Sequence, residues 1–113
     1  MVRIEAIFRP TRWPEVRAAL EDIGVQGISL IEIKGAGKQK GYTQHYRGSE
    51  YQVNLLPKVQ LIVVVRDSQK DQVVEAIEKA AITGELGDGK IFISPVLEAV
   101  RIRTGERGEA AVS

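Results

Sequence analysis

Cysteine is absent from this sequence of 113 residues, and histidine occurs only once, as His45. The absence of cysteine excludes a disulfide framework, a thiol nucleophile and a zinc site with cysteine ligands. A single histidine argues against a Ser-His-Asp triad and against a metal centre built from histidines. The sequence therefore lacks the residues on which several large classes of enzyme depend.

No charge of one sign predominates, and no long apolar run occurs. The 16 lysines and arginines balance 15 aspartates and glutamates, so the formal net charge is +1, whereas a nucleic-acid-binding protein usually has a clear basic excess. No segment approaches the roughly 18 apolar residues of a membrane span. Charges also interrupt the first apolar stretch, unlike a signal peptide. We therefore expect a cytoplasmic protein that binds no nucleic acid and meets a membrane only through a partner.

The residues that are present are typical of one globular domain covering residues 1–113. The hydrophobic fraction is 43% and the charged fraction 27%, both ordinary values for such a domain. Alternating apolar residues predict a strand over residues 2–8. Apolar stripes predict one helix from Pro14 to a stop at Gly24, and a second capped by Asp67 and Ser68. Further extended segments are predicted over residues 27–34, 59–65, 91–93 and 100–103.

The order of these elements is strand, helix, strand, long loop, strand, helix, strand. Two βαβ halves of this kind predict an α+β fold, the ferredoxin-like βαββαβ sandwich, with both helices on one face of the sheet. The strands at 27–34 and 59–65 carry apolar residues on both sides. We therefore expect self-association to cover the second face.

The polar stretch from Gly35 to about Gln52 is long for a loop inside a small domain, and such loops usually have a function. All three tyrosines, at positions 42, 46 and 51, fall within it, which favours interaction or modification sites. Its start is rich in glycine and lysine, which suits either an anion site or a solvated loop. Gln39 offers an amide oxygen for a hard cation, and Lys58, just past the loop, could pair with a carboxylate.

The turn from Thr83 to Lys90 contains three glycines and ends on a cation. Glycines let successive backbone amides approach an anion, so the turn could cradle phosphate. The spacing is not that of a Walker A motif, and a strand follows in place of a helix. A helix C-cap followed by a tight turn explains the same residues equally well.

Arg101 and Arg103 lie two residues apart in a segment predicted to be extended. Alternation would place both guanidinium groups on one face, where two donor forks suit a polyphosphate. The alternative is the exposed polar face of an edge strand.

Three segments resemble signatures of the PII family of nitrogen-signalling proteins. Residues 46–51 (YRGSEY) are similar to its T-loop, residues 83–92 (TGELGDGKIF) to its B-loop and residues 101–106 (RIRTGE) to its C-loop. The similarity is co-linear from Arg3 to about Ala111. It implies a T-loop at about 36–54, a B-loop at 83–90, a C-loop at about 101–109, and a homotrimer with nucleotide in each cleft between subunits.

The resemblance also implies roles for individual residues. The nucleotide, ATP or ADP, would be held by Ser29, Gly35, Gly37, Lys38, Val64, Gly87, Asp88, Gly89, Lys90, Arg101 and Arg103, the last two from the neighbouring subunit. Gln39 would complete a Mg²⁺ site shared by ATP and 2-oxoglutarate, and Lys58 would pair with the distal carboxylate of 2-oxoglutarate. Tyr51 matches a position uridylylated in some members, and Ser49 matches one phosphorylated in others.

The function implied is regulatory and not enzymatic. Such a protein reports the ATP/ADP ratio and the level of 2-oxoglutarate to targets such as an ammonium transporter, a glutamine synthetase regulator or N-acetylglutamate kinase. Two alternatives on a similar fold are a small phosphate-processing enzyme and an amino-acid-sensing regulatory domain. Neither a nucleophile with its base nor any other catalytic constellation is visible in the sequence.

Overall fold

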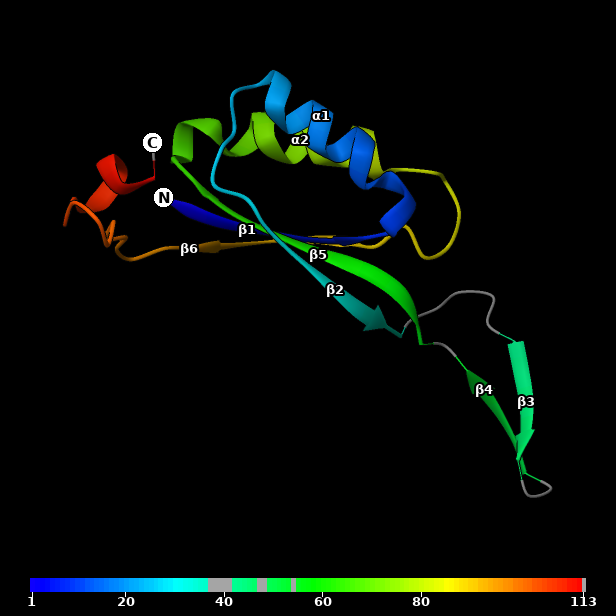
Figure 1. The fold of residues 1–113 in the computed structure, drawn as a ribbon. Helices are drawn as coiled ribbons and strands as arrows, with labels where there is room; N and C mark the ends of the chain where they lie inside the picture. The colour runs from blue at the N-terminus through cyan, green and yellow to red at the C-terminus, as the bar shows by residue number, and fades with distance from the viewer. Residues whose placement is uncertain (37–41, 47–48, 54, 113) are drawn as a thin grey trace.

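The computed structural model describes residues 1–36, 42–46, 49–53 and 55–112, with the backbone alone given at 42–46 and 49–53. Figure 1 shows the elements in order along the chain. The strands are β1 (Val2–Phe8), β2 (Ser29–Gly35), β3 (Tyr42–Tyr46), β4 (Ser49–Val53), β5 (Leu56–Val65) and β6 (Lys90–Pro95). The helices are α1 (Trp13–Asp22) and α2 (Lys70–Ala81), with short 3-10 helices η1 (Pro10–Arg12), η2 (Asp67–Gln69) and η3 (Gly108–Ala111).

Four strands form one antiparallel sheet in the order β2-β5-β1-β6. In the centre of this sheet Ala6 of β1 lies opposite Leu61 of β5 and Ile91 of β6. Both α-helices cover the same face of the sheet (Figure 1). This arrangement confirms the predicted ferredoxin-like βαββαβ fold.

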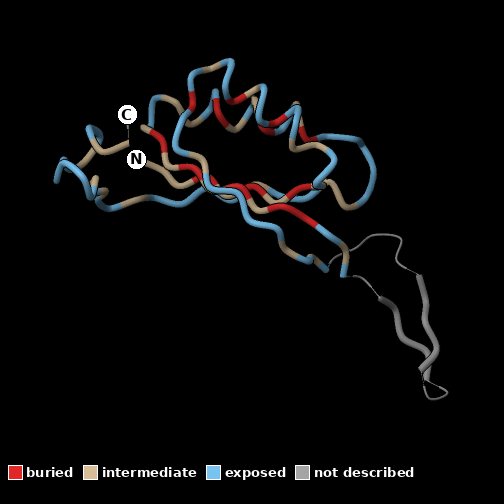
Figure 2. The backbone as a smooth tube through the Cα atoms, in the orientation of Figure 1, coloured by how far each residue is buried: buried red, intermediate tan, exposed pale blue. Residues whose placement is uncertain are grey.

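The hydrophobic core lies between the helices and the sheet, where Figure 2 shows the buried residues in red. Alternate residues of β1 point into it, so Ile4, Ala6 and Phe8 are buried. Each helix contributes its apolar stripe, listed here by residue: Val16 and Leu20 from α1, and Val73, Ile77 and Ala81 from α2. Full burial of a Leu or Ile side chain contributes about 1.5–3 kcal/mol, so these stripes account for the position of both helices.

The predicted end of the first helix is confirmed, but the predicted cap of the second is not. Gly24 follows α1 with a φ of 77°, and its amide donates to the carbonyl of Glu21 at 3.0 Å. Neither Asp67 nor Ser68 caps α2, whose N-cap residue Gln69 instead accepts a hydrogen bond from the Arg66 amide at the start of η2. The carboxylate of Asp67 lies 3.0 Å from the α-ammonium group of Met1 instead, because the start of β1 lies beside the end of β5.

The prediction of an extended segment at residues 100–103 is wrong. Val100 forms only an isolated bridge with Arg107, and residues 102–104 form a turn. The Gly105 amide donates to the carbonyl of Arg101 at 2.7 Å, and the Arg101 amide donates to the carbonyl of Glu106 at 2.9 Å. Gly105 has a φ of 74°, which permits the reversal. Arg101 and Arg103 therefore do not share the face of a strand.

The long polar stretch contains secondary structure that its sequence did not predict. β3 and β4 pair with each other as a separate antiparallel sheet, with Tyr42 opposite Val53 and Tyr46 opposite Ser49. The stretch has few aliphatic residues, so no apolar alternation marked these strands. The hairpin rests on backbone pairing, which composition does not reveal.

Candidate functional site

The loop between α2 and β6 folds around the carboxylate of Asp88. This carboxylate accepts hydrogen bonds from the Thr83 amide at 2.9 Å, the Gly84 amide at 2.8 Å and the Thr83 hydroxyl. The Thr83 hydroxyl, the two amides and the nearby Arg9 together hold the pKa of Asp88 well below its ordinary value, although desolvation opposes them. A negative charge inside the turn thus organises the amides that precede it.

Gly89 is the point at which this loop touches the sheet most closely. Its φ is 102°, and a Cβ atom built on it would lie 1.7 Å from the carbonyl oxygen of Ile7. Only glycine fits such an approach. The next residue, Lys90, pairs with Ile7 across β1 and β6. α2 ends at Ala81, three residues before the first glycine of the loop, so the glycines are not the stop of the helix.

Two cationic side chains, Lys58 and Arg9, donate hydrogen bonds to carbonyls of the loop between α2 and β6. Lys58 on β5 is buried, with 7% exposure, and its ammonium group donates to the Gly87 carbonyl. Arg9 donates to the Leu86 carbonyl at 2.5 Å, and its Nε lies 3.3 Å from a carboxylate oxygen of Asp88. Burial chiefly, and then the charge of Arg9, lower the pKa of Lys58, while Asp88 raises it. Lysine and arginine therefore form a compact basic group with one carboxylate.

Sequence reasoning missed Arg9. A basic residue directly after the strand that pairs with β6 was the signal that could have indicated it, since the end of that strand adjoins the glycine loop. Gly35 on β2 completes this part of the site, because a Cβ atom there would lie 3.1 Å from Cγ of Lys58. We call this region the loop end of the sheet, defined by Gly35, Lys58 and residues 84–90.

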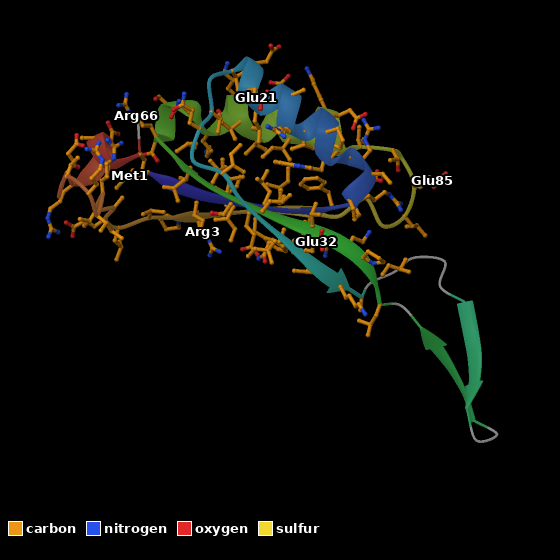
Figure 3. All side chains as sticks on the ribbon, in the orientation of Figure 1. Met1, Arg3, Glu21, Glu32, Arg66 and Glu85 are labelled. Atoms are coloured by element: carbon orange, nitrogen blue, oxygen red, sulfur yellow. The ribbon has the colours of Figure 1, made fainter. Side chains whose placement is uncertain are left out.

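Three other predicted residues lie at the opposite end of the sheet, around a cavity of about 670 Å³. Ser29, Val64 and Arg101 line it, and so do Arg66 and Gln69. We call this the cavity end. Lys58 and Val64 are six residues apart on β5, which corresponds to about 20 Å along a strand. Figure 3 labels Arg66 and Glu85 near these two ends of the four-stranded sheet.

The two predicted arginines of the C-terminal segment, Arg101 and Arg103, differ in their surroundings. Arg101 pairs with a carboxylate oxygen of Glu106 at 3.0 Å and donates to the carbonyl of Ala110 at 3.3 Å. These contacts fold the segment that ends in η3 back onto the cavity end, where Ala111 and Val112 complete the wall. Arg103 lies in the exposed turn.

Several predicted residues cannot be placed in this geometry. Gly37, Lys38 and Gln39 lie outside the described residues, and Ser49 and Tyr51 lie on β4, where the backbone alone is described. Within the described part of the chain, no three His, Asp or Glu side chains group in a way that could hold a metal ion. None of the helices described has the length and apolar character needed to cross a bilayer.

The family model for nitrogen regulatory protein P-II matches residues 1–106 of this chain. The chain belongs to the P-II family. It is 54% identical over 112 residues to nitrogen regulatory protein P-II of Azospirillum brasilense, covering 99% of this chain and all of that protein. It is 48% identical, with the same coverage, to nitrogen regulatory protein GlnK of Escherichia coli (strain K12).

A solved structure in the P-II family has the same fold. The crystal structure of Arabidopsis thaliana PII bound to citrate superimposes with a TM-score of 0.79 and 39% sequence identity, covering 97% of this chain and 90% of that one. These matches confirm the predicted family and fold, and with them the prediction of a nitrogen regulatory signalling protein. The matched P-II proteins are named as regulators.

Proposed function

We propose that this P-II protein senses ATP, ADP and 2-oxoglutarate at sites formed between copies of itself, and that it acts without catalysis in the cytoplasm. The observation that carries the proposal is the division of the predicted site residues between two ends of one sheet. One chain has the glycine loop and Lys58 at one end and Ser29, Val64 and Arg101 at the other. A complete site then requires the loop end of one copy and the cavity end of another.

A contact between the loop end of one copy and the cavity end of the next is heterologous. Such contacts close into a ring when the rotation that relates neighbouring copies permits closure. We propose a homotrimer, which the family resemblance implies. The second face of the sheet supports this assembly. Ile31 and Phe92, on the face away from the helices, are 47% and 53% exposed in the single chain. Copies packed around an axis would remove this apolar surface from water.

The loop end suits the phosphates of the nucleotide. The amides of Gly87 and Gly89 lie in a turn with positive φ, and Lys90 adds a charge next to them. In this proposal Asp88 shapes the loop, Gly35, Gly37 and Lys38 border the nucleotide, and Arg101 and Arg103 reach the phosphates from the neighbouring copy. Ser29 and Val64 border the base and ribose. Backbone amides and cations are the groups that bind phosphate best.

Lys58 suits a carboxylate. Lys58 is buried and its ammonium group donates to a neutral carbonyl, that of Gly87, so a carboxylate would improve its pairing. We assign it the distal carboxylate of 2-oxoglutarate. Gln39 would supply an amide oxygen to Mg²⁺, which also contacts ATP and the effector. Mg²⁺ favours oxygen ligands and often binds through substrate phosphates.

The segment at about residues 36–54 would transmit the state of the site to targets. An ammonium transporter, a glutamine synthetase regulator and N-acetylglutamate kinase are the candidate partners. If a target binds only one ligand-dependent arrangement of this segment, ligand and target affinities are coupled reciprocally. Modification at Tyr51 or Ser49 would add negative charge there and alter docking.

Calorimetric titration with ATP, ADP and 2-oxoglutarate, each with and without Mg²⁺, tests the proposal. We expect both nucleotides to bind, and 2-oxoglutarate to bind only when Mg²⁺ and ATP are present. Lys90→Ala should weaken the binding of both nucleotides. Lys79→Ala, which alters an exposed residue paired with Glu75 on α2, should leave both affinities unchanged. Failure of the wild-type protein to bind any nucleotide would refute the proposal. ATP turnover faster than about 1 s⁻¹, a rate typical of enzymes, would refute its non-catalytic part.

A further inference from the structure

Arg66 lies at the cavity end and has no role in the site described so far. It directly follows β5, two residues after Val64, and lines the cavity with Ser29 and Val64. Figure 3 shows it at the end of the sheet where η3 folds back, near Met1. Its amide donates to the side-chain oxygen of Gln69 at 3.2 Å, so its backbone is held at the start of η2.

The side chain of Arg66 contains an unsatisfied donor. Its Nε is buried, and it has no hydrogen-bond partner among the described residues. Most buried polar atoms in folded proteins are paired, because leaving a donor without a partner costs the free energy of its desolvation. A group in this state within a cavity is a candidate for pairing with a ligand.

The charges around the cavity favour an anionic ligand. Its described lining includes two arginines, Arg66 and Arg101, and no aspartate or glutamate. Arg101 is already engaged by Glu106 and by the carbonyl of Ala110. Of the two arginines that line the cavity, Arg66 is therefore the one with a buried donor that has no hydrogen-bond partner among the described residues. The volume of about 670 Å³ lies within the usual range of small-molecule sites.

We propose that Arg66 is a further binding residue of this site and that its guanidinium donates to phosphate oxygens of the bound nucleotide. The planar fork of arginine matches phosphate geometry and can donate through Nε and one terminal nitrogen together. This inference rests on the proposed function, because it takes the ligand to be a nucleotide. It adds a third arginine, which directly follows β5, to Arg101 and Arg103.

The test compares three ligands that differ in phosphate: ATP, adenosine and inorganic tripolyphosphate. Each is titrated into the wild-type protein and into Arg66→Met, which keeps an unbranched apolar stem and removes the charge and the donors. We expect ATP and tripolyphosphate to bind at least about tenfold more weakly to the variant, as for a lost charged hydrogen bond, and adenosine to bind equally well. Arg66→Lys should recover part of the loss, since it restores charge without the fork.

Arg17→Met is the matched control, because Arg17 lies on α1 and pairs with Glu21 on the exposed surface. It should bind all three ligands like the wild type. Circular dichroism must show that Arg66→Met is folded, and native mass spectrometry must show that it is assembled. If either test fails, Arg66→Gln is used in its place. Unchanged ATP affinity, or equal losses for ATP and adenosine, would overturn the inference and leave the proposed function intact. If the wild type binds neither ATP nor ADP, the proposed function fails, and tripolyphosphate then tests Arg66 as an anion site.

Discussion

The Asp88 carboxylate accepts hydrogen bonds from both the amide and the hydroxyl of Thr83, five residues earlier. One oxygen of the same carboxylate faces Nε of Arg9 at 3.3 Å. This single side chain therefore closes the glycine loop on itself and ties it to the end of β1. The position of the loop amides depends on it.

Asp88→Asn should destabilise the fold and disturb the loop. The amide cannot accept all the hydrogen bonds of the carboxylate, and the ion pair with Arg9 is lost. We expect a loss of about 1.5–2 kcal/mol in the free energy of unfolding, at the low end of the range for charged hydrogen bonds, measured by urea denaturation. ATP affinity should fall with it. Asp71→Asn, an exposed position on α2, should leave ATP affinity unchanged, and a stable Asp88→Asn with normal ATP affinity would contradict this role.

The stabilising effect of Asp88 should depend on pH in the acid range. Its hydrogen bonds lower its pKa in the folded protein, so the folded state binds the proton less readily than the unfolded chain. Its contribution is therefore fully present above the ordinary carboxyl pKa, about 4, and declines as the pH falls below that value. The difference in unfolding free energy between wild type and Asp88→Asn should be constant from about pH 5 to 7 and shrink below pH 4. A difference that grows on acidification would be inconsistent with this account.

Gly89→Ala should be much more damaging than Gly24→Ala, although both glycines have positive φ. At Gly24 an added Cβ meets nothing within 4 Å, whereas at Gly89 it would lie 1.7 Å from the Ile7 carbonyl oxygen. The backbone strain alone costs about 1–2 kcal/mol at each position. Steric displacement of the loop adds to this at Gly89 only. Thermal denaturation of the two variants measures the difference, and equal losses would argue against close contact between the loop and β1.

Lys58→Met should abolish the binding of 2-oxoglutarate and have a smaller effect on ATP. The buried ammonium group is the proposed partner of a carboxylate, and methionine fills a similar space without charge. The measurement is titration of 2-oxoglutarate into protein saturated with ATP and Mg²⁺. Lys79→Met, on the exposed side of α2, is the control. Normal 2-oxoglutarate affinity in Lys58→Met would remove this residue from the site.

Complementation between variants should show whether a site contains residues of two copies. Lys90→Ala removes a cation from the loop end, and Arg101→Ala removes one from the cavity end, so each protein alone should bind ATP weakly. Unfolded together and reassembled, a head-to-tail ring of the two variants should regain about one intact interface in four, by random pairing. Tight ATP binding at that stoichiometry is the expected result. No recovery in verified mixed assemblies would place both residues in a site within one chain.

Much of the fold could be predicted from local pattern. The alternation of Ile4, Ala6 and Phe8 predicted β1 with its observed bounds, since a strand buries every second residue. The stripe of Val73 and Ile77 predicted α2 because a helix repeats every 3.6 residues. The turn at residues 102–104 and the β3–β4 hairpin were missed. Both are held by backbone hydrogen bonds, and their side chains carry no periodic signal.

Residues of the candidate site could be proposed from the sequence, whereas the contacts between them could not. The composition of the turn with Gly87, Gly89 and Lys90 suggested an anion site and equally a tight turn after a helix. Arg9 was not, because its partner Asp88 is 79 positions away in the sequence. Such a contact exists only once the register of β1 and β6 has brought the two segments together.

By itself, the sequence determined the order of the elements, the absence of cysteine chemistry and the presence of a glycine loop with a following lysine. These properties depend on residue type and on spacing of a few positions. The tertiary structure decided where the loop and the arginines lie. Lys58 and Val64 occupy one strand, whose rise of about 3.3 Å per residue separates them by about 20 Å. That distance divides the predicted residues between two ends of the sheet, and it is the physical basis for proposing a site shared between two copies.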